Sequence, residues 1–242
     1  MSSSKARVLI VGGAMQYVGA PYLAAIAALR NGADSVLVMA PEKVAWAINT
    51  LSPDPISTKL KGTYLTLSHK KEIEKKLETA DVLVIGNGAT TQKGSAALMR
   101  VLMKWPGLKV IDADALKVLQ DSTVSNAILT PNEREWALLE QNVNMKKILK
   151  QNVVVKKGDR KTIILSGSKA FVMAHLHPNL SKAGMGDVLA GLCAGNLAKG
   201  LALLPAAKHA AAQGNRIAWA LSRKTVGFDL IASDILAGLK RK

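Results

Sequence analysis

Short, continuously apolar segments recur along this chain, and each is followed by a stretch of helical character. They occupy residues 7–11, 35–39, 81–85, 108–111, 126–129 and 153–156. Strands that alternate with helices pair in parallel through right-handed crossovers. Apolar residues on both faces of a strand indicate a sheet that is covered on both sides. The pattern therefore predicts an α/β fold, a three-layer α/β/α sandwich around a mostly parallel central sheet.

The rhythm changes after residue 156. Two short apolar runs, 162–165 and 170–174, are separated by the turn-forming sequence SGSK and predict a β-hairpin. The sheet should therefore end in an antiparallel edge. Helical segments are expected beyond it, at 187–199, 203–221 and 233–239. No repeat or flexible linker divides the 242 residues, so we expect a single domain spanning residues 1–242.

The longest uncharged run, residues 8–29, is long enough for a membrane helix, but Gly12, Gly13, Gly19 and Pro21 interrupt it. A strand, a loop and a helix explain the run better. Residues 1–5 lead directly into the first strand without an apolar signal segment, and Cys193 has no second cysteine for an internal disulfide. We therefore expect a cytoplasmic protein without a membrane span.

Lysine and arginine outnumber the acidic residues by 33 to 17, which gives a formal net charge of +16. This excess favours a polyanionic partner, either nucleic acid or a phosphate-bearing metabolite, although a basic surface without a specific partner is the simplest alternative. Aromatic residues make up only 4% of the chain, and the sequence has neither a zinc-finger spacing nor an aromatic RNA-binding motif. These features argue against nucleic acid.

Ligands of open parallel sheets bind outside the carboxyl ends of the strands, and unusual residues follow several of the expected strands. A glycine-rich stretch at 12–21 opens a helix at 22–30, and Gly86, Asn87 and Gly88 follow the strand at 81–85. Such loops either let the backbone approach an anion or make a tight turn. Asp112 and Asp114 follow the strand at 108–111 and could hold a metal or accept hydrogen bonds from hydroxyls. Capping of a helix at 115–119 is the simpler interpretation for at least one of them.

Two further strand ends carry polar residues. Asn132 is the expected N-cap of a helix whose first turn contains Glu133 and Glu135, and the functional alternative is that Asn132 and Glu135 position a hydrated Mg²⁺. Lys157 and Gly158 could meet nucleotide phosphates. The pair His175 and His177 lacks a nearby third ligand for a transition metal.

The sequence GMGD at 184–187 enters an apolar helix. Glycines at a helix N-terminus leave main-chain amides free to bind an anion, which suits a migrating phosphoryl group. An aspartate there would act as a base on the hydroxyl that attacks phosphorus. The alternative is that Asp187 only caps the helix. Cys193, in the same helix, is expected in the core.

Four of these motifs, in this order, resemble the ribokinase-like superfamily, and within it the ADP- or ATP-dependent NAD(P)H-hydrate dehydratases. They are DADAL at 112–116, TPNxxE at 130–135, VVVKKG at 153–158 and GMGDVLAG at 184–191. The opening at 12–25 and the ending at 227–234 are also similar to that family. The resemblance implies a ribokinase-like fold and a repair enzyme, in which a nucleotide phosphorylates the ring hydroxyl of the S epimer of NADHX or NADPHX and phosphate then leaves.

The resemblance also assigns roles to residues of this chain. Asp187 would contact the substrate hydroxyl as the base, and Gly184, Met185 and Gly186 would supply the anion hole. Residues Lys157, Gly158 and Thr162 would lie along the nucleotide, whereas Ala20, Gly88, Asn132, Asp112 and Asp114 would bind substrate. Mg²⁺ is expected with ADP or ATP, with Glu135 contacting it through water. The family also implies a homo-oligomer and a separate epimerase that supplies the S form.

Three departures from the family pattern keep an alternative open. After Thr-Pro the family usually has His-Pro-Gly-Glu, whereas this chain has NERE at 132–135, closer to sugar and vitamin kinases of the same superfamily. The family's GPGLG becomes GNGAT, with Thr90 in place of the last glycine, and the turn at 157–162 is one residue longer. A small-molecule kinase is therefore the alternative. A nucleotide-binding or nucleic-acid-binding protein without catalysis is third, since it has little use for an aspartate beside an anion hole.

Overall fold

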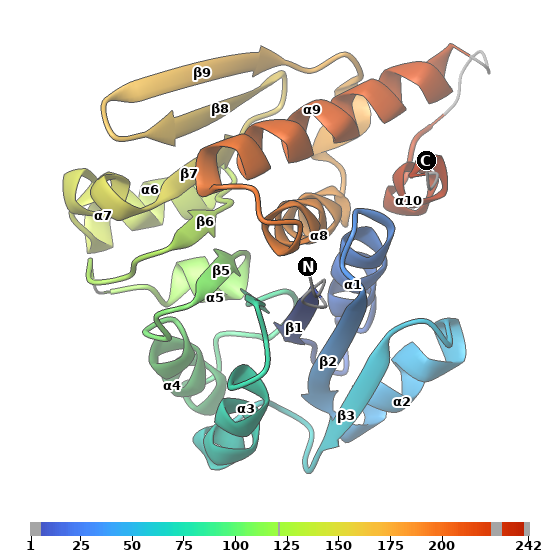
Figure 1. The fold of residues 1–242 in the computed structure, drawn as a ribbon, viewed down its shortest axis with the longest axis vertical. Coiled ribbons are helices and arrows are strands. Elements are labelled where there is room, and N and C mark those ends of the chain that lie inside the picture. Colours follow the sequence, from blue (N-terminus) through green and yellow to red (C-terminus); the bar gives the residue numbers. More distant parts are fainter. Residues whose placement is uncertain (1–5, 121, 224–228, 240–242) are drawn as a thin grey trace, which may run out of the picture.

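The computed structural model describes residues 6–120, 122–223 and 229–239, and its centre is a nine-stranded sheet (Figure 1). The strand order is β3-β2-β1-β4-β5-β6-β7-β8-β9. The first seven strands pair in parallel, and β8 and β9 form an antiparallel hairpin at the edge. The strands are β1 (Arg7–Val11), β2 (Ser35–Pro41), β3 (Ile56–Leu60), β4 (Val82–Ile85), β5 (Leu108–Ile111), β6 (Ala127–Leu129), β7 (Val153–Lys157), β8 (Lys161–Ser166) and β9 (Lys169–Ala174).

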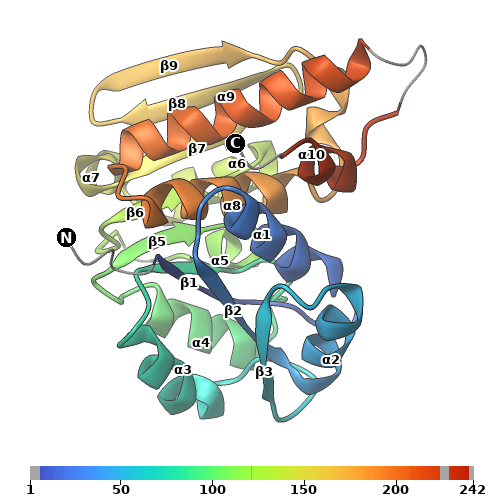
Figure 2. The ribbon, with the colours of Figure 1, turned by 45° about the vertical axis from the view of Figure 1, so that its right-hand side comes forward.

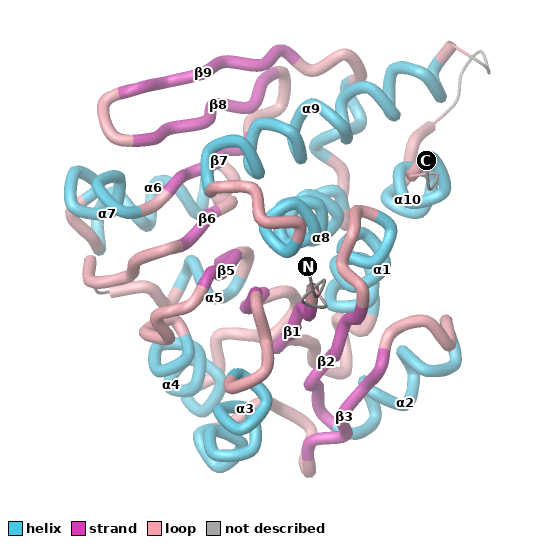
Figure 3. The backbone as a smooth tube through the Cα atoms, viewed as in Figure 1, coloured by secondary structure: helices cyan, strands magenta, loops and turns pink. Residues whose placement is uncertain are grey.

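Helices cover both faces of the sheet (Figure 3). Side chains alternate along each strand, so Val8 and Ile10 of β1 join one core while Leu9 and Val11 join the other. The first core is completed by α1 (Gly19–Arg30), α2 (Glu42–Leu51), α8 (Met185–Ala198), α9 (Leu203–Ser222) and α10 (Ala232–Gly238). The second is completed by α3 (Lys70–Leu77), α4 (Lys93–Leu102), α5 (Asp114–Lys117), α6 (Glu133–Asn142) and α7 (Met145–Gln151).

Helix α8 lies against α1 over the middle of the sheet (Figure 2). Glycine at position 191 permits this approach, because a Cβ there would lie 2.2 Å from the carbonyl oxygen of Ala24. α8 is apolar on almost every side and is buried between the sheet, α1 and α9. Its position is thus fixed by packing, and its N-terminal turn is held at the carboxyl end of the parallel strands.

The strand order reverses between β1 and β4, which are neighbours in the sheet although β2, β3 and three α-helices separate them in sequence. The loops after these two strands meet, and the amide of Gly13 donates a 2.8 Å hydrogen bond to the carbonyl of Asn87. Ligands of doubly wound sheets bind in the crevice at such a reversal. The topology therefore places a candidate site at the loops after β1 and β4.

The sandwich and the antiparallel edge predicted from sequence are confirmed. The strand β3 was not predicted, because ISTKL lacks the continuous apolar run of the other strands. The helix expected at 115–119 is the shorter α5, Asp114–Lys117. Residues 1–5, which precede the first strand, and residues 227–228, the start of the family-like ending, lie outside the described residues. In the described part of the chain, no helix combines the length and apolarity needed to cross a membrane.

Candidate active site

Polar residues from the ends of β4, β5, β6 and β7 meet at the first turn of α8. Asn87, Asp112 and Thr130 each follow their strand directly or by one residue, and Lys157 ends β7. Asp187 lies in the first turn of α8, after Gly184, whose φ of +83° starts the helix from a left-handed conformation. Because the carboxyl ends of parallel strands share one edge of the sheet, residues far apart in sequence form one cluster there.

Asp112 is the most connected side chain in this cluster. It is buried, and its Oδ1 accepts hydrogen bonds from Thr130 Oγ1 at 2.6 Å and from Lys157 Nζ at 2.9 Å. Its Oδ2 accepts one from Asn87 Nδ2 at 2.9 Å. A buried carboxylate is tolerated when donors and a cation surround it, and Asp112 has both.

Asp187 is connected to the same cluster by a single side chain. Its Oδ1 accepts a 2.7 Å hydrogen bond from Asn87 Nδ2. Burial raises the pKa of Asp187 to about 6, and the negative charge of Asp112 acts in the same direction, whereas the Asn87 hydrogen bond and Lys157 oppose the rise. A carboxylate with a pKa near neutrality is suited to take a proton during a reaction.

Lys157 brings positive charge to the start of α8. A Cβ at Gly186 would lie 2.9 Å from Lys157 Nζ, so the ammonium sits directly against the first turn of the helix. Burial lowers the pKa of Lys157, but the charges of Asp112, Glu135 and Asp187 outweigh this and hold it above its usual value. The lysine is therefore a fixed cation beside helix amides that lack intrahelical acceptors, a combination that favours an anion.

Three pockets surround this cluster. The first pocket, of about 720 Å³, lies in front of Lys157 and the start of α8. The residues that line it are Asp112, Ala113, Asn132, Glu133, Arg134, Glu135, Lys157, Gly158, Asp159, Leu180, Ser181, Lys182, Ala183, Gly184, Gly186 and Asp187. It therefore contains both the cation and the candidate anion hole.

The second pocket, of about 540 Å³, lies on the other side of Asp187, over the reversal point of the sheet. The residues that line it are Gln16, Tyr17, Ala20, Gly88, Thr90, Thr91, Ala113, Asp114, Lys117 and Asp187. Ala113 and Asp187 belong to both pockets. The carboxylate of Asp187 thus stands at the wall between two cavities that are each of the usual size for a small ligand.

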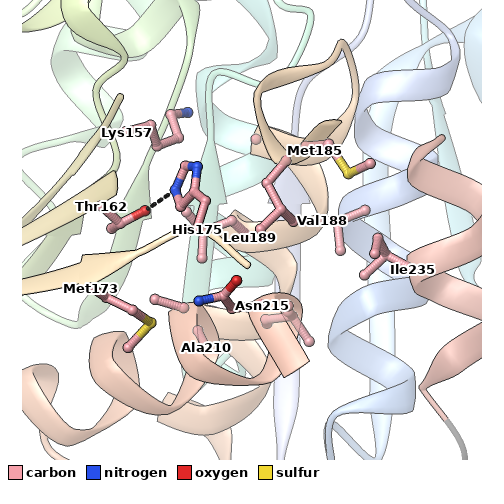
Figure 4. A pocket seen from close by; sticks show the side chains of 15 residues that line it. Lys157, Thr162, Met173, His175, Met185, Val188, Leu189, Ala210, Asn215 and Ile235 are labelled. Carbon is pink, nitrogen blue, oxygen red and sulfur yellow. Dashed lines mark hydrogen bonds between the residues drawn. The ribbon is translucent and has the colours of Figure 1, made fainter. Parts of the chain in front are cut away.

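The third pocket is small, about 60 Å³, and lies beneath the β8–β9 hairpin, between α8 and α9 (Figure 4). Its walls are mostly apolar, with Thr162 and His175 on one side, where Thr162 Oγ1 and His175 Nε2 are 2.9 Å apart. Lys157, Leu180 and Gly186 line both this pocket and the first one. The two cavities therefore adjoin, and the polar end of the third pocket lies next to the lysine.

The structure distributes the residues predicted from sequence over these pockets. Of the predicted nucleotide residues, Lys157, Gly158, Gly184 and Gly186 line the first pocket, and Thr162 and Met185 line the third. Three predicted substrate residues, Ala20, Gly88 and Asp114, line the second pocket. Asn132 and Asp112 instead line the first, beside Glu135. The nucleotide and substrate roles of all these residues stay predictions.

The structure also decides between some of the structural alternatives. Neither Asp112 nor Asp114 caps α5, whose N-cap is Ala113 with no side-chain cap bond, so capping as the role of either aspartate is wrong. Both carboxylates instead accept hydrogen bonds from other donors. Those of Asp114 come from the amide of Thr90 and from Lys117 Nζ. Asp187 does not cap α8 either. Asn132 does cap α6, in a reciprocal capping box with Glu135.

The sequence assigns no role to Asn87 or Thr90, although the structure places Asn87 in the cluster and Thr90 at the wall of the second pocket. Asn87 bonds two carboxylates, and Thr90 lines the second pocket with a φ of +65°, a conformation that β-branched residues rarely adopt. The signal in the sequence is that both stand where a glycine-rich loop would be expected. His175 was considered only as a metal ligand, and its bond to Thr162 has no local sequence signature.

Comparisons with known proteins agree with this geometry. A family model described as NAD(P)H-hydrate dehydratase matches residues 8–237. The chain is 34% identical over 250 aligned positions to the bifunctional NAD(P)H-hydrate repair enzyme Nnr of Pyrobaculum aerophilum, covering 97% of this chain and 50% of that protein. The chain thus spans about half the length of the curated relatives it matches.

Two solved structures show the same fold. A ribokinase-like superfamily protein from Enterococcus faecalis superimposes with a TM-score of 0.81 at 21% identity, covering 99% of this chain and 88% of that one. The ADP/ATP-dependent NAD(P)H-hydrate dehydratase from Bacillus subtilis, co-crystallised with ATP/Mg²⁺, gives a TM-score of 0.71 at 20% identity, covering 99% and 90%. The fold is therefore ribokinase-like, and the chain belongs to the NAD(P)H-hydrate dehydratase family.

Proposed function

We propose that this protein is an ADP- or ATP-dependent dehydratase that converts the S epimer of NADHX or NADPHX back to NADH or NADPH. The observation that carries the proposal is the position of Asp187, at the wall shared by the first and second pockets. A phosphoryl donor in the first pocket and a hydroxyl in the second would meet at this carboxylate. Membership of the dehydratase family supports the choice of substrate.

In the first step, the ring hydroxyl of the hydrate attacks the terminal phosphorus of the nucleotide. A new O–P bond forms, the bond from that phosphorus to the nucleotide's bridging oxygen breaks, and Asp187 accepts the hydroxyl proton. Lys157 and the amides of Gly186 and Asp187 stabilise the negative charge on the phosphoryl oxygens. A carboxyl group whose pKa is about 6 is mostly ionised at neutral pH, so Asp187 can accept this proton as the hydroxyl attacks.

In the second step, the ring C–O bond breaks and phosphate leaves with its electron pair, assisted by the ring nitrogen. The neighbouring ring carbon then loses a proton, which restores the double bond of the reduced nicotinamide. The nucleotide thus loses one phosphate and the hydrate loses the elements of water. The chain contributes the same anion-binding groups to both steps, because the departing phosphate occupies the place of the transferred phosphoryl group.

Magnesium fits the first pocket through the chemistry of its oxygen donors. Glu135 lines this pocket, and its Oε2 is fixed there by a 2.9 Å hydrogen bond from the amide of Asn132. Mg²⁺ prefers oxygen ligands, keeps several waters and is commonly held by one or two carboxylates and by substrate phosphates. We propose that Glu135 holds a hydrated Mg²⁺ through water. When bound, the ion would neutralise charge on the nucleotide phosphates.

The proposal also names a setting for the enzyme. An epimerase that interconverts the two epimers of the hydrate would act together with it, since the reaction is proposed for the S form. We propose the cytoplasm as its compartment, because nicotinamide cofactors and nucleotides are abundant there. A single domain and a homo-oligomeric assembly are part of the same proposal. The first is supported by the absence of a repeat or linker in the sequence, and the second by the family resemblance.

The experiment that tests this function is incubation of the protein with NADHX, Mg²⁺ and either ADP or ATP, while the absorbance of the reduced nicotinamide is followed. We expect absorbance to appear only when nucleotide is present. The matched control is the Asp187→Asn variant under the same conditions. Absence of any absorbance with both nucleotides, in protein that binds them, would refute the substrate assignment.

A small-molecule kinase is the second candidate, and the Asn132–Glu135 capping box in the first pocket favours it, since the motif departs from the usual dehydratase sequence toward that of sugar and vitamin kinases. Both reactions use the same base and anion hole, but a kinase releases a stable phosphorylated product. Nucleotide consumption with a sugar or vitamin, together with inactivity toward NADHX, would support the kinase.

A further inference from the structure

Two buried side-chain oxygens in the described part of the chain have no hydrogen-bond partner, and both belong to the loop after β4. They are Asn87 Oδ1 and Thr90 Oγ1. An unpaired buried polar atom lowers the stability of the fold, so its presence needs an explanation. For Asn87 the explanation is the pair of hydrogen bonds that Nδ2 of the same amide donates.

The orientation of the Asn87 amide is imposed by two carboxylates. Nδ2 donates to Asp112 Oδ2 at 2.9 Å and to Asp187 Oδ1 at 2.7 Å. Rotating the amide by half a turn would bring Oδ1 against both carboxylates, which is repulsive and breaks both bonds. The orphaned oxygen is therefore the consequence of keeping the amide group between Asp112 and Asp187.

The backbone of Asn87 is fixed as firmly as its side chain. Its carbonyl accepts a 2.8 Å hydrogen bond from the amide of Gly13, and a Cβ at Gly12 would lie 2.5 Å from the same oxygen. The residue is completely buried at the reversal point of the sheet. With its backbone held in this way, Asn87 is a fixed donor that orients the carboxylate of Asp187.

Charged groups from three elements act on Asp187. Asp112 and Asp114, from the end of β5 and the start of α5, raise its pKa, and Lys157 of β7 lowers it. Lys157 donates its hydrogen bond to Asp112 rather than to Asp187. Among the described residues, Asn87 is thus the one side chain that donates a hydrogen bond to the Asp187 carboxylate. The bond is made to Oδ1, and Oδ2 of Asp187 accepts none.

We propose that Asn87 is a positioning residue, which holds one oxygen of the Asp187 carboxylate, keeps the group ionised between two other acidic residues, and leaves Oδ2 to receive the substrate's proton. This inference rests on the proposed function of Asp187 as the base. It adds a residue that the family motif does not supply, because the family pattern GPGLG has proline at the position of Asn87. The role belongs to this chain's own sequence.

The test is Asn87→Leu, which keeps a similar volume and removes the donor. Loss of a hydrogen bond to a charged group corresponds to about one to two units of pKa. We therefore expect the acid limb of the pH–kcat/KM profile to move up by about one unit or more. The variant should lose activity about fivefold or more near pH 6 and recover much of it near pH 9. Asn87→Ala should move the limb in the same direction and serves where the leucine variant does not fold.

The matched control is Thr130→Val. The Thr130 hydroxyl donates a 2.6 Å hydrogen bond to Asp112 in the same buried cluster and makes no hydrogen bond to Asp187. Its loss should lower the thermal midpoint but leave the acid limb in place. A lowered midpoint with an unshifted acid limb in both Asn87 variants would show that Asn87 is merely structural, and the proposal would fail.

A measurement without substrate separates this proposal from the proposed function. In protein labelled with ¹³C at the aspartate carboxyls, the Asp187 signal is assigned by its absence from Asp187→Asn, and its titration is followed in wild type and in Asn87→Leu. A higher midpoint in the variant supports the positioning role even if NADHX is not the substrate. An unchanged midpoint in a folded variant overturns the role even if NADHX is turned over.

Discussion

Replacement of Asp187 by asparagine distinguishes a catalytic base from a structural carboxylate. The amide keeps the shape of the side chain, and its oxygen can still accept the hydrogen bond from Asn87, but it takes no proton. We expect turnover of the hydrate to fall by about 10²–10⁴-fold, the usual contribution of a positioned base. Nucleotide affinity should change little, because Lys157 and the helix amides are unaltered.

The same substitution should lower activity but raise the stability of the folded protein at neutral pH. The pKa of Asp187 is about 6 in the folded protein, against an ordinary value of 3.8. The folded state therefore binds more protons than the unfolded state between these values, and stability falls as pH rises from about 4 to about 6. A shift of about two units corresponds to about 3 kcal/mol of destabilisation above that range. Asparagine removes this penalty, so the variant should be more stable than wild type near pH 8.

The assay is urea unfolding of wild type and variant near pH 4.5 and near pH 8, with turnover measured on the same preparations. The difference in unfolding free energy should grow in favour of the variant as pH rises. Asp34→Asn is the control, because that carboxylate accepts a hydrogen bond from the amide of Ala6 ahead of β2, away from the pockets, and should leave turnover unchanged. Near-normal turnover, or a variant that is equally destabilised at both pH values, would refute the assignment of Asp187.

Two further substitutions probe the neighbours of Asp187. Lys157→Met leaves the buried Asp112 without its cation, so the free energy of unfolding, measured by urea titration, should fall by about 2–4 kcal/mol. Nucleotide affinity, measured by calorimetry, should fall by about tenfold or more. Unchanged affinity would show that Lys157 is not part of the nucleotide site. Thr90→Gly relieves a φ of +65° and deletes an unpaired buried hydroxyl, so the protein should gain about 1 kcal/mol. A loss of stability in that variant would mean that packing of the threonine methyl outweighs the strain.

The layers of this fold are readable from sequence because each parallel strand is buried on both faces. Segments such as VLIV and VLVI have no polar face, and only a sheet covered by helices on both sides accommodates them. The edge strand β3 is not predicted, because it is not buried on both faces. Its residues Ile56–Leu60 are mostly exposed or half-buried, so its sequence is under no such constraint, and local pattern gives no sign of it.

In the candidate site too, a residue is predictable from sequence only where the signal is local. Asp187 is predictable because the signal is local, since glycines, an acidic residue and an apolar helix follow one another directly. The role of Asn87 is not predictable, because its partner Asp187 lies 100 residues further along the chain. Only the meeting of strand ends brings them within 2.7 Å. Thr90 is marked in the sequence only because it stands in place of a glycine, and its left-handed conformation is known only from the fold.

The aspartates show why local rules mislead at such a site. In an isolated strand-to-helix turn, Asp112 would cap the helix that follows, which is the simplest bond within its reach. In the folded chain its oxygens instead accept hydrogen bonds from three donors at other strand ends, and one of these donors is an ammonium. These donors stabilise a buried carboxylate more than one amide would. Among the described residues, its neighbour Asp187 receives one hydrogen bond from an amide and none from an ammonium. Two carboxylates in one site thus acquire different tasks from the number of donors each receives: Asp112 anchors Lys157 and Asn87, and Asp187 keeps the free oxygen that a proton needs.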